Sequence, residues 1–455
     1  MFHARLMQSA VLLFAWMLAP TASPSVAAGP PSAPGAEVLF REVRVFDGRS
    51  AALSAPTDVL VRGNTIAAIG AGAAPTGDAA KVIEGGGRTL MPGLIDAHVH
   101  VAFQTLPQTA LLLGDVGYVH IAAGKGATEM LMRGFTSVRD LGGPTFGVKQ
   151  AIDSGLIPGP RIWPSGAMVS QSGGHGDFRL PNELPSPPGA WSYGERMGAA
   201  AIADSPDAVR QRVREQLALG ASQIKLMAGG GVSSSYDPLD VAQYSVAELR
   251  AAVEAAENWG TYVTVHAYTP RAVRQAIEAG VKSIDHGQLL DDATAKLMAE
   301  KGVWWSLQPF ADDGTSTFPE GSPNRLKQLQ MLNGTDTAYR LAKKHRIRTA
   351  FGTDALFSRV AAARQNAMIL RLTRWYSNAE ILRMVTADNA ELLALSGLRS
   401  PYAGKLGVIE PGALADLLLV DGDPMAEIEL LGDPARNFLV IMKDGVVHKN
   451  TLAAD

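Results

Sequence analysis

The segment LIDAHVH (residues 94–100) sets the expected fold, because it begins a series of short apolar runs that are separated by helix-like stretches. Seven further runs follow: TSVRDLG (136–142), RIWPSG (161–166), QIKLMAGG (223–230), YVTVHAY (262–268), SIDHG (283–287), VWWSLQP (303–309) and TAFGTDA (349–355). Between them, residues 205–220 and 245–260 each begin with a capping serine and end with glycine, as helices do. Eight β/α units predict an α/β fold of the (β/α)₈ TIM-barrel type.

The two ends of the chain have a different pattern. Short β-type runs with turn signals occupy residues 37–91, and this pattern returns in the C-terminal part. We therefore expect residues 29–91 and 398–455 to form one small composite β-sandwich domain beside a catalytic barrel of residues 92–397.

Residues 1–28 have the composition of a signal peptide. A weakly basic start is followed by the apolar segment Leu6–Leu18 and by small residues that end at Ala28. This pattern predicts a periplasmic or secreted protein without stable membrane insertion, and an uncleaved N-terminal anchor is the alternative.

Composition excludes several classes of protein. The 455 residues are 47% hydrophobic, so a sizeable core can form. The net charge is −3 without a long run of one sign, which speaks against nucleic acid as a partner. The absence of cysteine excludes disulfides, thiolate ligands and cysteine nucleophiles. The expected partner is a small-molecule amide substrate, and the sequence leaves a homo-oligomer open.

The first run carries two histidines, His98 and His100, that are spaced for one face of a strand. At the C-terminal end of a parallel barrel strand, that face lies at the barrel mouth, where active sites of this fold are found. Two imidazoles there suit a divalent metal such as zinc. The H-x-H pair alone is weak evidence, because such pairs also occur by chance.

Three later runs end in further metal-binding residue types: His266, His286 and Asp354. The chain has nine histidines, and four of them fall at barrel-strand ends, which core packing explains poorly. Lys225 interrupts the apolar fourth run, and burying an ammonium is costly unless it is paired or chemically changed. A carbamate formed with carbon dioxide would bridge two cations. The alternatives are hydrogen-bonded core histidines and a lysine that extends to solvent.

Three residues are weaker candidates for substrate binding. His175 lies in the glycine-rich loop SGGHGD (172–177), where a substrate-contact or oxyanion role competes with that of an ordinary loop histidine. Tyr236 follows the fourth run and would hold a substrate carbonyl or carboxylate unless it is a surface tyrosine. Arg139 ends the second run, and it contacts substrate or pairs with Asp140 to brace the barrel.

Together these features resemble the amidohydrolase superfamily. The resemblance rests on MPGLIDAHVH (91–100), the barrel lysine, the two later histidines, the late aspartate and the tail GKLGVIEPGALADLLLVDGDP (404–424). The resemblance covers almost the whole chain after the predicted signal peptide and the short segment that follows it. TSVRDLGG and SGGHGD narrow the resemblance to prolidase-like and ochratoxinase-like amide hydrolases, which are related to imidazolonepropionases.

The resemblance implies a site with two divalent metal ions, for which zinc is expected. It assigns His98, His100 and Asp354 to one metal, His266 and His286 to the other, and a carbamylated Lys225 to the bridge between them. A metal-activated hydroxide would then attack the amide carbonyl, while Asp354 takes the proton of the water and passes it to the leaving amine. Tyr268 departs from the pattern, since many relatives have a second histidine there.

The predicted function is hydrolysis of an amide bond in a dipeptide or N-acyl amino acid, with ochratoxin-like amides included. Two other functions stay open. An imidazolonepropionase-like hydrolase of cyclic amides would use one metal and no bridging lysine. A non-catalytic periplasmic protein that binds metal or ligand would not need the proton shuttle Asp354.

Overall fold

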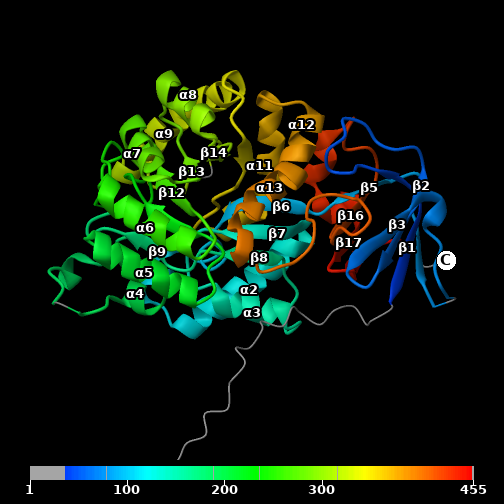
Figure 1. Cartoon of the computed structure of the whole chain (residues 1–455), viewed down its shortest axis with the longest axis horizontal. Coiled ribbons are helices and arrows are strands. Elements are labelled where there is room, and N and C mark those ends of the chain that lie inside the picture. Colours follow the sequence, from blue (N-terminus) through cyan, green and yellow to red (C-terminus); the bar gives the residue numbers. More distant parts are fainter. Residues whose placement is uncertain (1–35, 78, 188, 235, 315, 453–455) are drawn as a thin grey trace, which may run out of the picture.

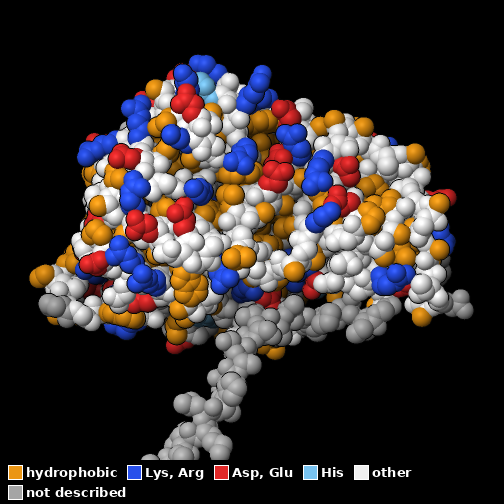
Figure 2. Space-filling model, viewed as in Figure 1, with side chains coloured by type: hydrophobic (Ala, Val, Ile, Leu, Met, Phe, Trp, Pro, Cys, Tyr) orange, Lys and Arg blue, Asp and Glu red, His pale blue; other side chains and the backbone are white. Residues whose placement is uncertain are grey.

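The computed structural model describes residues 36–77, 79–187, 189–234, 236–314 and 316–452. The predicted signal peptide, residues 1–28, lies outside these residues. Within the described part of the chain, no helix combines the length and the apolar character needed to cross a bilayer. On the face drawn in Figure 2, positive and negative side chains are interspersed, in keeping with the small net charge of −3.

Each of the eight predicted runs forms a strand of a TIM-barrel-like domain. The strands are β6 (Leu94–Val99), β7 (Phe135–Asp140), β8 (Arg161–Pro164), β11 (Ile224–Met227), β12 (Val263–Ala267), β13 (Ser283–His286), β14 (Trp304–Leu307) and β15 (Thr349–Phe351). All their residues are buried, as expected for parallel strands that are covered on both faces.

The barrel closes through two junctions between parallel sheets. One sheet has the order β6-β7-β8, and the other has the order β10-β9-β11-β12-β13-β14-β15, which includes β9 (Met168–Ser170) and β10 (Ala200–Ile202). At the first junction, Ser222 N donates to the Pro164 carbonyl (2.7 Å). At the second, Asp354 N donates to the His98 carbonyl (2.8 Å), which brings the end of β15 against β6.

Helices lie around these strands (Figure 1). Ser205 caps the first of the two predicted helices, and Ser245 forms a capping box with Glu248 at the second. The helices are α1 (Gln108–Leu113), α2 (Val116–Met132), α3 (Phe146–Asp153), α4 (Tyr193–Arg196), α5 (Pro206–Ala218), α6 (Val246–Asn258), α7 (Pro270–Ala279), α8 (Asp292–Lys301), α9 (Pro323–Lys344), α10 (Arg359–Ala363), α11 (Gln365–Leu370), α12 (Asn378–Arg383), α13 (Asn389–Leu393) and α14 (Pro434–Asn437).

The two ends of the chain share one eight-stranded sheet. Its strands are β1 (Glu37–Val45), β2 (Thr57–Arg62), β3 (Thr65–Ile69), β4 (Lys81–Glu84), β5 (Thr89–Pro92), β16 (Leu417–Val420), β17 (Phe438–Lys443) and β18 (Val446–Asn450). The antiparallel pair β5–β16 joins the two halves, which lie together at one end of the molecule in blue and red (Figure 1). The two-layer sandwich arrangement and the predicted domain limits stay predictions.

A buried ion cluster connects the barrel to this sheet. Arg161, the first residue of β8, lies 2.9 Å from Asp416 (Nε to Oδ2) and 2.6 Å from Asp444 (Nη2 to Oδ1). Asp416 directly precedes β16, and Asp444 directly follows β17. Because the arginine side chain is only 4% exposed, both ion pairs are shielded from water.

We expect Arg161→Ala to lower the free energy of unfolding by about 3–5 kcal/mol, since it leaves two carboxylates without their buried cation. Arg41→Ala is the control, because Arg41 and its partner Glu84 are both about half exposed. Such surface pairs contribute about 0–1 kcal/mol. Urea unfolding at equal metal content measures both effects, and equal losses in the two variants would contradict a connecting role for Arg161.

Candidate functional site

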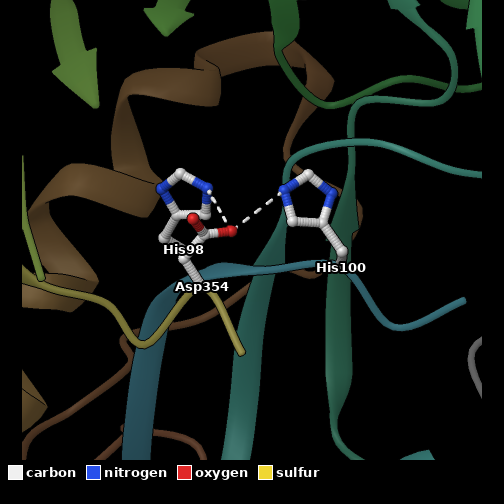
Figure 3. Close-up of side chains that lie close together, drawn as sticks. All are labelled: His98, His100 and Asp354. Carbon is white, nitrogen blue, oxygen red and sulfur yellow. Dashed lines mark ion pairs between the residues drawn. The ribbon is translucent and has the colours of Figure 1, made fainter. Parts of the chain in front are cut away.

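Three residues at the barrel mouth converge on one point. Nε2 of His98 and Nε2 of His100 each lie 3.4 Å from Oδ1 of Asp354. Figure 3 shows both imidazoles directed towards this carboxylate oxygen. His98 Nε2 and Asp354 Oδ1 are buried and have no hydrogen-bond partner among the residues that the structure describes. Buried polar atoms without a partner are costly, so the three side chains fit a divalent cation between them.

His266 on β12 and His286 at the end of β13 continue this group. The ring centroids of His266 and His286 are 4.5 Å apart, and those of His98 and His286 are 4.9 Å apart. His286 Nε2 lies 4.0 Å from Asp354 Oδ2. The structure therefore brings all four predicted histidine ligands and the predicted aspartate into one cluster.

Hydrogen bonds behind the rings leave a free nitrogen on three of the four imidazoles. His100 Nδ1 donates to the Gly142 carbonyl (3.0 Å), and His266 Nε2 donates to the Gly230 carbonyl (3.0 Å). His286 Nδ1 donates to the amide oxygen of Gln308 (2.8 Å). Burial lowers the pKa of His266 and His286 well below the usual value, so both rings are neutral at neutral pH. A neutral imidazole whose other nitrogen is held by an oxygen is the form that binds metals.

Gln308 is a supporting residue that the sequence analysis did not single out. It follows β14, is fully buried and contacts two of the candidate ligands. Besides its bond to His286, its Nε2 lies 3.3 Å from His98 Nδ1. The only sequence signal is an amide residue at the end of an apolar run, VWWSLQP (303–309).

Lys225 lies inside the barrel and is only 1% exposed, so it does not extend to solvent. Its Nζ donates to Asp285 Oδ2 at 2.6 Å, and Arg139 Nη2 donates to Asp285 Oδ1 at 2.7 Å. Burial raises the pKa of Asp285, but the two neighbouring cations outweigh this and hold that pKa well below its usual range. Two buried cations thus share one ionised carboxylate, a partner that the sequence analysis missed.

Arg139 lies in the barrel interior and is not among the residues that line the cavity, which corrects the expectation that it contacts substrate. Its guanidinium is fully buried and donates to Asp285, to the Ala97 carbonyl (2.6 Å) and to the Tyr262 hydroxyl (3.1 Å). It therefore braces the barrel as the alternative proposed, although its partner is Asp285 rather than Asp140.

Tyr236 is also placed away from the expected position. The residue is 41% exposed, and its hydroxyl donates to the Arg179 carbonyl at 2.8 Å. It is not among the residues that line the cavity at the metal cluster. The structure thus shows Tyr236 tying one outer loop to another, as a surface tyrosine would.

His175 and Tyr268, by contrast, both line the cavity. The His175 ring stacks on His266 with centroids 4.0 Å apart, and its Nδ1 lies 2.7 Å from Ser234 Oγ. Burial lowers the pKa of His175 to about 4, so its imidazole is neutral at neutral pH. Tyr268 lies edge-on to His266 at 5.0 Å, and burial raises the pKa of its phenol well above the usual value.

The cavity extends from the histidine cluster along mainly apolar walls. Aromatic and thioether side chains supply much of the lining, among them Phe103, Phe178, Phe310, Phe318, Met331 and Phe357. Besides Lys225 and Asp354, the charged residues in the lining are Asp312, Asp313, Arg325, Arg364 and Arg371. A concave apolar site with a few convergent polar groups is typical of small-molecule binding.

The Amidohydrolase family model matches residues 89–449. Ochratoxinase from Aspergillus niger is 32% identical over 364 residues, which are 76% of this chain and 72% of that protein. A solved prolidase complexed with N-methylphosphonate-L-proline is 34% identical with a TM-score of 0.83, covering 91% of this chain and 100% of that one. A Xaa-Pro dipeptidase with bound methionine in the active site is 28% identical with a TM-score of 0.78. This match covers 91% of this chain and 100% of that one. The chain belongs to the amidohydrolase family and is a hydrolase that acts on carbon–nitrogen bonds.

We expect Gln308→Leu to weaken metal binding about 10–100-fold, because it removes the amide oxygen that accepts from His286 Nδ1 and so leaves His286 Nε2 free for a metal. Gln216→Leu is a matched control, since Gln216 is also buried but bonds the Ala167 backbone amide instead. Titration of the metal-depleted variants with zinc measures the affinity. Equal zinc affinities of the two variants would show that Gln308 does not orient the ligands.

Proposed function

We propose that this hydrolase cleaves the amide bond of dipeptides or N-acyl amino acids that carry an apolar side chain. The observation that carries the proposal is the continuity of the histidine–aspartate cluster with an apolar cavity, which offers a reaction centre and a side-chain pocket in one space. The similar proteins support it, because one is an ochratoxinase, another is complexed with a phosphonate derivative of proline, and a third has methionine bound.

The proposed centre holds two divalent metal ions, with zinc as the expected metal. His98, His100 and Asp354 would hold one ion, and His266 and His286 would hold the other. When bound, such ions polarise a carbonyl and make water acidic enough to attack it near neutral pH. The paired buried atoms without a partner, His98 Nε2 and Asp354 Oδ1, support this assignment.

Lys225 is proposed to bridge the two ions as a carbamate. Its neutral amine would add to carbon dioxide, with formation of a nitrogen–carbon bond and release of one proton to solvent. Because Lys225 and Arg139 already share the single carboxylate of Asp285, an ammonium beside two metal ions would add uncompensated positive charge. The carbamate reverses that charge, and its remaining N–H can still donate to Asp285.

Asp354 is proposed to move the proton. Burial raises its pKa, but the neighbouring His98 and His100 outweigh this effect and hold the pKa well below its usual value. Its carboxylate is therefore ionised before reaction and can accept a proton from water. It then delivers this proton to the nitrogen of the leaving amine as the carbon–nitrogen bond breaks. His175 is neutral and lines the same cavity, so we assign it to the substrate oxygen as a hydrogen-bond donor.

Metal removal tests the proposed centre. We expect about two divalent ions per chain in the purified protein, and loss of amide hydrolysis after chelation. His98→Ala should lose metal and activity together, because it removes one of the three converging ligands. The assay panel is dipeptides, N-acyl amino acids, ochratoxin-like amides and a cyclic amide. Full activity without metal would exclude this mechanism, whereas two bound ions without any turnover would favour a binding protein.

Lys225→Ala tests the bridge. We expect loss of at least one metal ion and of most activity, with partial rescue by acetate or propionate, which can replace the bridging carboxylate. Lys225→Arg should not restore the metal ion or the activity, because the guanidinium stays charged and cannot carry the carbamate. Lys149→Ala is a matched control, since Lys149 is a buried lysine paired with Asp153 away from the cavity. Metal analysis and kcat are the measurements. Unchanged metal content and near-normal turnover in Lys225→Ala would show that Lys225 does not bridge the ions, and a content of one ion per chain with turnover of the cyclic amide would favour the single-metal hydrolase.

A further inference from the structure

Two arginines line the cavity on the segment that leads away from the reaction centre. Arg364 lies between α10 and α11, and Arg371 directly follows α11. Between Asp354 and Arg371, the cavity is also lined by Ala355, Leu356, Phe357, Ala361 and Met368. One continuous stretch of chain therefore runs along the wall from a proposed metal ligand to this arginine pair.

The two guanidinium groups converge on a single carboxylate oxygen. Arg364 Nη2 lies 3.0 Å from Oδ2 of Asp313, and Arg371 Nη2 also pairs with this oxygen. Asp313 belongs to the loop between β14 and α9. Burial lowers the pKa of Arg371, and the neighbouring Arg364 cation lowers it further. Two cations around one carboxylate leave room for a second anion, which would relieve their mutual repulsion.

Arg325, the third arginine that lines the cavity, has more carboxylates than cations around it. Its Nη2 lies 2.8 Å from Asp312, and its Nε lies 3.3 Å from Glu320. One cation is thus matched by two carboxylates. An incoming anion is therefore stabilised at the Arg364–Arg371 pair and not at Arg325.

The pair is also open to the cavity. The side chain of Arg364 is 40% exposed and that of Arg371 is 24% exposed, so both present donors that a ligand can reach. A guanidinium offers five N–H donors in a planar fork, which matches the two oxygens of a carboxylate. Arg371 uses one of its donors on the Pro309 carbonyl (3.3 Å), which holds the group in position.

We propose that Arg364 and Arg371 bind the free carboxylate of the substrate, so that the enzyme acts on amides whose amine product is an α-amino acid. The amide carbonyl lies at the histidine cluster, the apolar side chain lies against the aromatic wall, and the carboxylate lies at the arginine pair. This inference rests on the proposed function, and it adds a requirement for the negative charge at one end of the substrate.

The test compares N-acetyl-L-phenylalanine with N-acetyl-L-phenylalaninamide, which lacks the charge but keeps the scissile amide and the side chain. We expect the wild-type enzyme to prefer the acid by about 10–100-fold in kcat/KM, the range for charge-assisted hydrogen bonds. Arg364→Met should raise KM for the acid by a similar factor, leave kcat little changed and leave the carboxamide unaffected. Arg374→Met is the matched control, because this arginine is 65% exposed, pairs with Asp336 and does not line the cavity.

Two results would overturn the inference: equal use of acid and carboxamide by the wild type, or a preference for the acid that survives in Arg364→Met. Calorimetric titration with L-phenylalanine separates this inference from the proposed function. If no amide is hydrolysed, the proposed function fails. Weaker binding of L-phenylalanine to Arg364→Met than to Arg374→Met would then still support the carboxylate site, and equal binding would reject it.

Discussion

The carboxylate of Asp285 is the contact on which the interior of the barrel depends. It accepts hydrogen bonds from Lys225 (2.6 Å), Thr264 (2.7 Å) and Arg139 (2.7 Å), which lie on three other strands. Without this anion, the fully buried guanidinium of Arg139 would have no compensating charge, at a cost of several kcal/mol. The same carboxylate fixes the direction of Lys225 towards the cavity. The electrostatic balance of the barrel and the position of its key lysine therefore have one origin.

Strand alternation explains why much of the site could be predicted. On β11 and β12, the residues that point inward follow a period of two: Lys225 and Met227, then Thr264 and His266. The histidines of the first strand obey the same rule. Parallel strands end together at the barrel mouth, so short sequence patterns were sufficient to predict that these side chains lie close to one another.

The same rule explains why Asp285 was missed. His286 and Asp285 are adjacent, so a regular strand would place them on opposite faces. The backbone of His286 is left-handed, with φ of 76°, and both side chains consequently reach the interior. Asp354 is similar, with φ of 48°. A left-handed conformation is uncommon for residues other than glycine, and no sequence pattern indicates it at these two positions.

Long side chains at strand and loop ends were harder to predict, because their direction depends on partners that are distant in the sequence. Arg139 donates to the carboxylate of Asp285, which is 146 residues away in the sequence. Tyr236 donates to the carbonyl of Arg179, which is 57 residues away. Gln308 gains its role only from histidines that other strands supply. Spacing along the chain specifies which face a residue occupies, but not which of several polar neighbours it binds.

The shared terminal sheet has a consequence for the order in which the protein folds. One edge of β5 pairs with β1, which is made shortly before it, but the other edge pairs with β16 at residues 417–420. Bringing these edges together closes a loop that contains the entire barrel, and closing such a loop has an entropic cost. At roughly 5–20 residues per second, translation leaves the β5 edge without its partner for tens of seconds. An unpaired strand edge is prone to associate with other chains, so the nascent protein is most vulnerable to aggregation until its last strands emerge.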